Sequence, residues 1–510
     1  PAEALKPAEA PKPTAAPAAA APAKPGATLV AAGESIGDNY DPSVSFQGWS
    51  HAWTAANLFD TLVDSRDGKI SPALATQWST SPDRLTYTFK LRPNVKFHDG
   101  TPFDAEAVAF NYMRQIDDKH PSYQAQSITR GVTLVGVTKV EATGPLEVTF
   151  TRSRPSVAML AQLALPWAGI MSPTAIQKFG ADYGRSPVGT GPFVFEKGAK
   201  GDEASMTAFP DYWGTKPSVG RVVIRAIPDL SSVNAALLAG EVDLTQNVDF
   251  KDLAAHRRNS RLKVEVVPGA SYGYLAVNNQ APNLKDVRVR RALAHAIDSR
   301  QIIDVILYGE AEPPAGFLTP PVPGYAKELL NYYPYDQAKA RALLAEAGMA
   351  DLALNLWAPS NGFWPGMAEL MQAELAKVGV KISVEKIDPA RFGGQVSEGK
   401  HDLFIWDGSQ SSADPGELMN SFFLSSNPRS MGRYGFNNKE FDDLVAAQDA
   451  EADEAKRQPI LLQAQKLLLD QVPQVFLYHG RFATVMSSRV QGFKTLPFRH
   501  AVYFNGITLS

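Results

Sequence analysis

The sequence predicts an α/β protein with more than one domain, and three observations support this prediction. The chain has 510 residues, which is too long for a single hydrophobic core. It contains 44% hydrophobic and 20% charged residues, the balance of a globular protein. Segments with the two-residue period of strands alternate with segments of helical period, and this alternation is typical of α/β folds.

The N-terminal segment differs in composition from the rest of the chain. Nineteen of the first 27 residues are Ala or Pro. Such a segment has little to bury and favours extended or polyproline conformations. We expect residues 1–27 to form a disordered tail, either a tether that holds the folded body away from another structure or a tail without a role. The first residue is Pro, which fits removal of a signal peptide or trimming of the sequence.

The most regular local pattern is Leu85–Arg114, which predicts strand, turn, strand, turn and helix. Tyr87, Phe89 and Leu91 fall on one face of the first strand. A hairpin is expected to follow through Val95, Phe97 and the His-Asp-Gly turn after them. Asp104 is placed to cap the helix.

The remaining elements follow from periodicity and from the residues that interrupt it. Gly348 and Gly379 each follow a helical pattern and are expected to end it. The further expected strands are Thr28–Ala32, Val135–Ala142, Leu146–Thr151, Arg221–Ile227, Gly240–Leu244, Leu262–Val267, Tyr272–Asn278, Leu352–Trp357, Val380–Ile387, His401–Trp406, Val475–Tyr478 and Thr484–Met486. The further expected helices are Gln47–Leu62, Pro155–Ala164, Leu230–Ala239, Val287–Ala296, Asp298–Leu307, Asp336–Ala347, Met367–Val378, Phe441–Gln448 and Glu454–Asp470.

Composition excludes several classes of function. With 50 basic and 53 acidic residues and a net charge of −3, the chain has no basic surplus for nucleic acid. It has no cysteine, hence no disulfide and no thiolate metal site. Its eight histidines are scattered without the spacing of metal ligands, so we expect no metal and no cofactor. The longest apolar stretch, Val157–Met171, is shorter than the ~20 residues of a membrane helix.

Four segments in the same order resemble one known family, the solute-binding proteins of ABC importers of the peptide/nickel (dipeptide and oligopeptide) type. The segments are Ala73–Phe103, ending LTYTFKLRPNVKFHDGTPF; PVGTGPF at Pro187–Phe193 with the Asp-Tyr-Trp-Gly turn at Asp211–Gly214; Tyr274–Ile297; and Tyr335–Gly348 with Leu375–Val380.

The resemblance implies the two-lobed periplasmic-binding-protein fold (type II, cluster C), an α/β fold with an extra domain inserted in lobe one. Lobe one would span 28–65, 187–270 and 480–510, the inserted domain 66–186, and lobe two 271–479. Two crossing strands, near Pro268–Asn278 and Leu477–Gly480, would join the lobes. The implied protein is a monomer, exported to the periplasm or cell surface, that closes on a small-molecule ligand and delivers it to a permease in the membrane.

The ligand is expected between the lobes, with most contacts from lobe two. Loops on rigid scaffolds collect binding residues, although the aromatic members of this set could equally pack the lobes. The candidates are Trp357, Asn361, Phe363 and Trp364 after one strand; Trp406, Asp407, Gly408, Ser409 and Ser411 after another; Tyr272 on a crossing strand; and Asp38, Asn39 and Tyr40 after the first strand of lobe one.

The predicted class of ligand depends on the residue at position 411, which is Ser411. In peptide-binding relatives an Asp three residues before the acidic residue of an Asp-Pro step holds the α-amino group of the peptide. Here that step is Asp414-Pro415, and the corresponding residue is Ser411. No Arg stands between Leu356 and Trp364 to meet a ligand carboxylate. A short or modified peptide, such as a glutathione-like γ-linked peptide, fits this pattern, and an oligosaccharide stacked on the aromatic residues is the alternative.

Catalytic motifs are missing from the sequence. There is no Gly-x-Ser-x-Gly elbow, no His-Glu-x-x-His and no glycine-rich phosphate loop. We therefore expect a binding protein rather than an enzyme. A secreted carboxylate-based hydrolase stays open, because its two acids need not be close in sequence.

Overall fold

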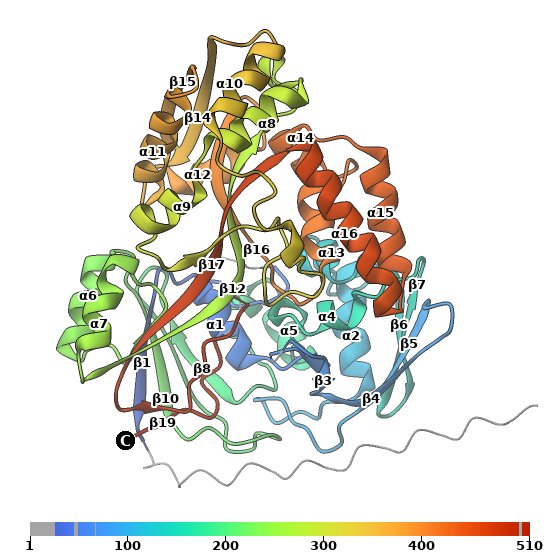
Figure 1. The fold of residues 1–510 in the computed structure, drawn as a ribbon. Helices are drawn as coiled ribbons and strands as arrows, with labels where there is room; N and C mark the ends of the chain where they lie inside the picture. The colour runs from blue at the N-terminus through green and yellow to red at the C-terminus, as the bar shows by residue number, and fades with distance from the viewer. Residues whose placement is uncertain (1–25, 45–48, 67, 499–501) are drawn as a thin grey trace, which may run out of the picture.

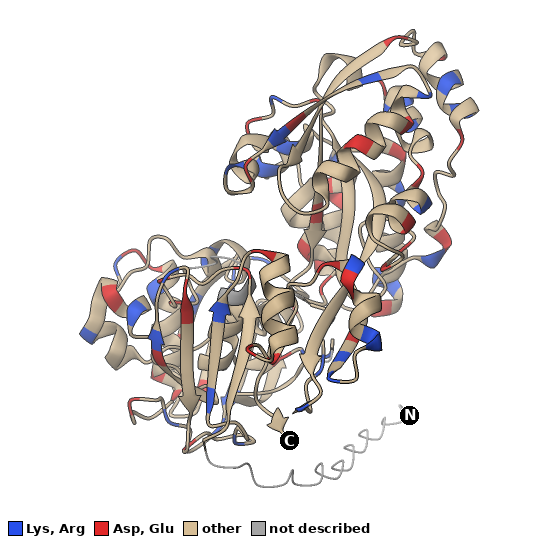
Figure 2. Cartoon of the chain, turned by 90° about the vertical axis from the view of Figure 1, so that its left-hand side faces the viewer, with Lys and Arg blue, Asp and Glu red and all other residues tan. Residues whose placement is uncertain are grey.

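The computed structural model describes residues 26–44, 49–66, 68–498 and 502–510. The chain forms two lobes, one above the other in Figure 1, joined by the long strands β12 (Leu262–Val277) and β17 (Gln474–Ser487). Most of the predicted tail, residues 1–25, lies outside the described residues. In the view of Figure 2, basic and acidic residues are interspersed over both lobes. Within the described part, no helix is long and apolar enough to span a membrane.

A single 11-stranded sheet runs through both lobes in the order β15-β14-β16-β12-β17-β11-β1-β10-β9-β8, with β13 paired to β17 outside this path. Parallel pairs occur in each lobe: β1 with β10 and β11, and β14 with β15 and β16. The strands are β1 (Thr28–Gly33), β8 (Phe193–Gly198), β9 (Glu203–Ala208), β10 (Arg221–Ala226), β11 (Leu244–Thr245), β13 (Ala311–Glu312), β14 (Leu352–Pro359), β15 (Val380–Ile387) and β16 (Leu403–Ser409).

Helices cover both faces of this sheet, and in Figure 1 α6, α7, α9 and α11 lie on one side of the crossing strands and α13 and α16 on the other. Val475 packs under the helices α8–α11 of lobe two, and Val485 packs under α6 and α7 of lobe one. Phe476 and Met486 point to the opposite face. The first face carries α6 (Leu230–Ala239), α7 (Leu253–Arg258), α8 (Val287–Ala296), α9 (Ser299–Gln301) with the π-turn η5 (Ile302–Ile306), α10 (Gln337–Glu346) and α11 (Trp364–Ala376). The second carries α1 (Trp49–Leu58), α5 (Pro173–Phe179), α12 (Pro389–Val396), α13 (Gly416–Leu418), α14 (Pro428–Tyr434), α15 (Lys439–Ala450) and α16 (Glu454–Gln471).

The module that is most regular in sequence forms a separate sheet beside lobe one, in the order β4-β5-β7-β6. Phe89 and Phe150 pack edge to face at 5.4 Å in its core. The predicted cap is confirmed, because the Asp104 carboxylate accepts the Ala107 N–H at 2.9 Å. The elements are β4 (Ala75–Thr80), β5 (Thr86–Leu91), α2 (Ala105–Ile116), α3 (Ile128–Val132), β6 (Val137–Gly144), β7 (Glu147–Arg152) and α4 (Met159–Leu163). The short strands are β2 (Val63–Asp64), β3 (Ser71–Pro72), β18 (Val490–Gln491) and β19 (Thr508–Leu509).

Three sequence predictions about elements were wrong. Leu262–Val267 and Tyr272–Asn278 form one strand, because pairing with β17 continues through Pro268–Arg481 and resumes at Tyr272–His479 after a register shift. The segments predicted at 475–478 and 484–486 are likewise one strand, β17. The hairpin expected after β5 is reduced to an isolated bridge between Lys96 and Pro102.

Candidate ligand-binding site

The end of β16 lies where the two lobes meet. Its residues pair with the crossing strand β12 as far as Ser409–Ser271. On the other side, β14 pairs with β16 only at two positions, the last being Trp357–Phe404. Beyond Phe404, no strand among the described residues pairs with this side of β16. The segment from Ile405 to Ser409 therefore presents a strand edge at the lobe boundary.

A buried carboxylate holds the loop that follows β16. Glu417 accepts the backbone N–H groups of Ser411 and Ser412, each at 2.9 Å, and the Ser412 hydroxyl at 2.6 Å. Burial raises the pKa of Glu417. The Gln410 N–H also donates to the Ala270 carbonyl of β12 at 2.8 Å. These bonds fix the loop to the crossing strand before any ligand binds.

Two buried polar atoms in this loop lack hydrogen-bond partners among the described residues. They are the Ser409 Oγ and the Gln410 Oε1. The Gln410 side chain is fully buried, and its amide nitrogen donates to the Asp414 carbonyl at 3.0 Å. A buried acceptor without a donor costs about 1–3 kcal/mol, so these atoms favour a bound group that completes their hydrogen bonds.

Ser411 lines a narrow gap between the lobes, which we call the β16-side gap. Lobe two contributes Ser411, and the facing wall is made of Ser65, Arg66, Ala164, Leu165, Pro166, Leu496, Phe498 and Tyr503. The Arg66 guanidinium lies 4.4 Å from the ring centre of Tyr503 and pairs with Asp64. Ser411, which stands where relatives carry an anionic anchor, thus lines the same gap as the Arg66–Asp64 ion pair.

The predicted residues of lobe one and of the crossing strand occupy different environments. Tyr40 is 1% exposed and packs on Phe195 with ring centres 4.9 Å apart. Tyr272 is fully buried beside the ring of Tyr274. Asn39 is half-buried, and its side-chain oxygen accepts the N–H of the second residue after it at 3.0 Å. Asp38 is exposed. Tyr40 and Tyr272 therefore contribute to the cores of their lobes.

The predicted tryptophans also pack within lobe two. Trp406 lies edge to face with Phe392 at 4.7 Å, and the Arg433 guanidinium lies 5.2 Å from its ring centre. Trp357 lies in β14, within the strand predicted at Leu352–Trp357. Trp364 opens α11, three residues before the predicted start of that helix, and packs against the core under α8–α11. None of these three rings lines the β16-side gap.

Asn361 and Phe363 line a second interlobe cavity of about 770 Å³, which we call the α9-side cavity. Its walls come from the segments that follow β1, β10, β11 and β14, from η5, and from β17 at 481–483. It shares no lining residue with the β16-side gap. The two predicted loops of lobe two therefore line different cavities at the lobe boundary.

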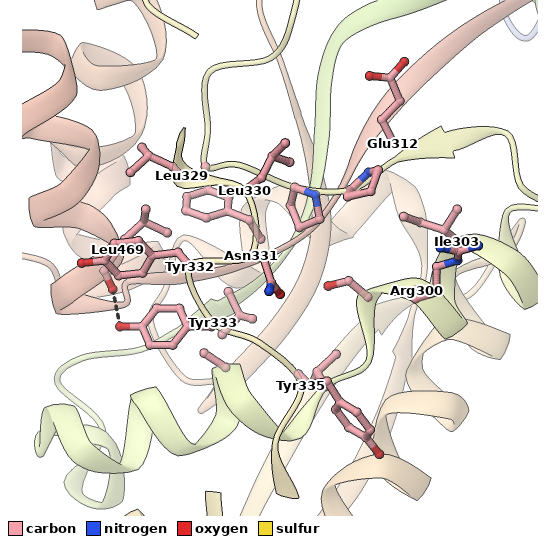
Figure 3. A pocket seen from close by; sticks show the side chains of 18 of the residues that line it. Arg300, Ile303, Glu312, Leu329, Leu330, Asn331, Tyr332, Tyr333, Tyr335 and Leu469 are labelled. Carbon is pink, nitrogen blue, oxygen red and sulfur yellow. Dashed lines mark hydrogen bonds between the residues drawn. The ribbon is translucent and has the colours of Figure 1, made fainter. Parts of the chain in front are cut away.

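A third cavity, of about 630 Å³, lies within lobe two. Figure 3 shows Tyr332, Tyr333 and Asn331 on one side of it and Arg300 on the other. The Tyr333 hydroxyl donates to the Leu469 carbonyl at 2.9 Å, the dashed line of Figure 3. Because its walls belong to a single lobe, lobe closure would not act on a molecule bound there.

Sequence reasoning missed Glu417, Gln410 and Arg66. Glu417 follows the Asp-Pro step closely enough to be noticed as an acid that could fold back on the serine-rich loop. Gln410 stands between two predicted residues, and only its burial without an acceptor partner distinguishes it. No local sequence pattern points to Arg66. It is far from Ser411 in the chain, and only the fold brings both residues to the β16-side gap.

Comparison with known proteins gives the family. Residues 69–430 match the family described as bacterial extracellular solute-binding proteins, family 5 Middle. The chain belongs to this family. It is 30% identical to the dipeptide-binding protein of Escherichia coli over 92% of each chain, and 30% identical to heme-binding protein A of Haemophilus influenzae over 91% of this chain and 89% of that protein. It superposes with a TM-score of 0.84 and 28% identity on the Helicobacter pylori periplasmic binding protein DppA in complex with peptide STSA, covering 95% of this chain and 98% of the other.

Family membership confirms the predicted fold class and the predicted class of function. The chain is an extracytoplasmic substrate-binding protein that captures a small solute and works with the permease of an ABC transporter. The family is one of binding proteins, so the hydrolase alternative is not favoured.

Proposed function

We propose that this protein captures a short or modified peptide, held in extended form along β16 between Ile405 and Ser409. The observation that carries the proposal is the strand edge that β16 presents beyond Phe404. A peptide backbone alternates N–H and C=O groups with the period of such an edge, and strand addition is a common mode of peptide recognition. The unpartnered Ser409 Oγ and Gln410 Oε1 add hydrogen-bond acceptors at the same place.

Relatives support a peptide without restricting the class to plain dipeptides. They include a dipeptide-binding protein and a binding protein in complex with the peptide STSA, but also a heme-binding protein. In this chain Ser411 replaces the usual anionic anchor, and Arg66 faces it across the β16-side gap. Because Arg66 is already paired with Asp64, a ligand whose amino group is modified or met elsewhere fits this replacement.

The oligosaccharide alternative has weaker support. This alternative requires sugar rings to stack on the aromatic rings of Trp357, Phe363, Trp364 and Trp406. The three tryptophans pack within lobe two, and Phe363 lines the separate α9-side cavity. Sugar rings would therefore find few free aromatic faces next to β16.

The domain boundaries and cellular location belong to the same proposal. Lobe one comprises 28–65, 187–270 and 480–510, the inserted domain 66–186, and lobe two 271–479. The register shift between Pro268 and Tyr272 falls where β12 passes between the lobes, which suits a hinge that absorbs backbone rotation. The protein acts as a monomer in the periplasm or at the cell surface.

Mass spectrometry of ligand released from the native protein, followed by calorimetric titration, tests the proposal. The panel is a dipeptide, a tripeptide, glutathione and maltotriose. We expect peptide-type ligands to bind and maltotriose not to bind. Gln410→Ala should weaken peptide binding about tenfold, or ~1.4 kcal/mol. Gln77→Ala, an exposed change on β4, is the matched control and should leave the affinity unchanged. Selective binding of maltotriose, or full affinity in Gln410→Ala, would contradict the proposal.

A further inference from the structure

The cavity within lobe two, which we call the lobe-two cavity, is separate from the space between the lobes. Its walls come from α8 and α9, from the irregular segment 312–335, and from the end of α16 and the start of β17. It shares no lining residue with the β16-side gap or the α9-side cavity. Its volume of about 630 Å³ is within the ~300–1,000 Å³ of small-molecule sites. A molecule bound there is therefore distinct from a solute held between the lobes.

Two tyrosine rings on one wall of the lobe-two cavity are fixed before any ligand binds. The Tyr332 hydroxyl donates to the Asp470 carboxylate at 2.7 Å, and the Tyr333 hydroxyl donates to the Leu469 carbonyl at 2.9 Å, so both rings are held at the end of α16. They lie edge to face with their centres 5.3 Å apart. Tyr332 is nevertheless 37% exposed, and Figure 3 shows Leu330 above it. A flat apolar group bound against this ring would cover exposed surface at a low entropic cost.

Lys327 differs from the other charged side chains that line the cavity. The Asp298 carboxylate caps α9 by accepting two backbone N–H groups. Arg300 pairs with the acid four residues later at 3.0 Å, and Glu312 pairs with an arginine of β17 at 3.2 Å. Lys327 is exposed and makes no ion pair with any residue that the structure describes. An anion beside Lys327 would gain an opposite charge without breaking an existing pair.

Asn331 supplies a second hydrogen-bond donor from the same stretch of turns. The Leu330 N–H donates to the Lys327 carbonyl at 3.1 Å, which closes the turn before Asn331. Asn331 has a φ of 60°, a left-handed conformation that asparagine tolerates. Its side chain is exposed, lines the cavity and makes no hydrogen bond with another described residue, and Figure 3 shows its amide on the side of Tyr333 that faces Arg300. Lys327 and Asn331 are therefore placed to donate to one anion.

We propose that the lobe-two cavity is a second binding site, which takes a small carboxylate with an aromatic body. The aromatic ring packs against Tyr332 and Leu330, and the carboxylate accepts hydrogen bonds from the Lys327 ammonium and the Asn331 amide. The bond from Lys327 joins two ionised groups and is the stronger of the two. Because every wall belongs to lobe two, the molecule binds the open and the closed form alike and does not compete with the solute held between the lobes.

Calorimetric titration of the whole chain with 3-phenylpropionate tests the proposal, and 3-phenylpropan-1-ol is the neutral counterpart of this probe. The carboxylate should bind more tightly than the alcohol by about fivefold or more. Lys327→Gln should weaken the carboxylate by about fivefold or more. Lys466→Gln, the same change at an exposed position of α16 outside the cavity, should leave its affinity unchanged. Asn331→Gly should weaken the carboxylate about twofold, and glycine adopts the left-handed backbone of this turn without strain.

Two changes at Tyr332 separate the role of its ring from that of its hydroxyl. Tyr332→Ala should weaken 3-phenylpropionate about fivefold, whereas Tyr332→Phe keeps the ring and should bind it about as tightly as the wild-type protein. Lys327 is exposed, so an unchanged melting temperature should confirm that Lys327→Gln is folded.

Absence of 3-phenylpropionate binding to the wild-type protein would overturn the proposal, as would full affinity in Lys327→Gln. Weakening by Phe363→Ala but not by Lys327→Gln would place the probe in the α9-side cavity and would also overturn it. None of these results depends on whether a peptide binds at β16.

Discussion

The two faces of the sheet differ at the lobe boundary. On the β16 side, a strand edge and a loop fixed by Glu417 offer backbone groups and polar side chains in fixed positions. On the α9 side, Val305, Tyr308 and Phe363 are exposed apolar side chains. The two sides of the lobe boundary therefore differ in chemistry, with fixed polar groups on one side and exposed apolar side chains on the other. The difference predicts that substitutions on the β16 side act on both stability and peptide affinity, whereas those on the α9 side leave stability almost unchanged.

The largest effect is expected for Glu417→Ala. The change leaves the N–H groups of Ser411 and Ser412 without their acceptor, and each unpaired buried donor costs about 1–3 kcal/mol. We expect the free energy of unfolding to fall by roughly 2–4 kcal/mol and peptide affinity to fall with it. Urea denaturation and calorimetric titration measure the two quantities. Exposed Glu328→Ala is the control, and a loss of similar size there would show that Glu417 has no special role.

A matched pair of glycines gives the next largest effect. An added Cβ at Gly408 would lie 2.7 Å from the Tyr272 Cε1, whereas one at Gly366 would meet only the Ile306 Cδ1, at 3.7 Å. Tyr272 is fully buried and has no room to move. Gly408→Ala should therefore cost about 1–3 kcal/mol of stability and weaken peptide binding. Gly366→Ala, inside α11, should stabilise by roughly 0.5–1 kcal/mol. Thermal unfolding ranks the variants, and equal melting temperatures would refute the close contact at Gly408.

The sequence predicts the fold better than it predicts the site, and particular elements show why. The strand at Tyr87–Leu91 and the Asp104 cap are set by neighbouring residues, so periodicity and capping rules predict them. The continuity of β12 depends on its partner β17 more than two hundred residues away, which carries the strand across Pro268 and Gly269. Local rules treat Pro-Gly as a break and therefore split the strand.

The packing of the predicted site residues is hidden from the sequence for a related reason. The loop after the strand at His401–Trp406 predicts Ser409 and Ser411 as ligand contacts. Both lie at the lobe boundary in the structure. Trp406 and Tyr272 are predicted as ligand contacts partly because they are aromatic. The sequence alone does not distinguish an aromatic side chain that lines a cleft from one that is buried in the core beneath it. Only tertiary packing distinguishes them, as the contact of Trp406 with Phe392 shows.

A pH dependence of intermediate size is expected at Asp449, where lobe two meets the segment after β7. The Asp449 carbonyl accepts the Val157 N–H at 3.1 Å. Burial and the charge of Asp414 raise the pKa of the Asp449 carboxyl from 3.8 to about 6. Between these values the folded protein holds a proton that the unfolded chain releases, so this group's contribution to stability falls as pH rises from about 4 to 6.

Asp449→Asn should remove that part of the pH dependence, up to about 1.4 kcal/mol for each unit of the pKa difference. Urea denaturation at several pH values between 4 and 7 measures it. Asp351→Asn, whose side chain is 90% exposed, should leave the slope as in the wild-type protein. An unchanged slope in Asp449→Asn would show that this carboxyl titrates at its ordinary pKa.

The smallest effect is expected from an ion pair that links the lobes on the α9 side. The Arg257 guanidinium of α7 lies 2.5 Å from the Glu310 carboxylate of lobe two, and Arg257 is 44% exposed. Exposed pairs contribute less than about 1 kcal/mol, so Arg257→Ala should hardly change the melting temperature. Because the pair spans the lobes, its loss should still alter the balance between open and closed forms and change peptide affinity by less than about fivefold.

Salt distinguishes this role from a general effect of charge removal. At high ionic strength the pair is screened, so the affinity difference between the wild-type protein and Arg257→Ala should shrink. Arg300→Ala removes a pair with Asp304 within lobe two and should not change peptide affinity at any salt concentration. Calorimetric titrations at low and high salt compare the two variants. If both shift the affinity equally, the pair at Arg257 does not act through the lobes, and the contrast between the two faces would rest on the β16 side alone.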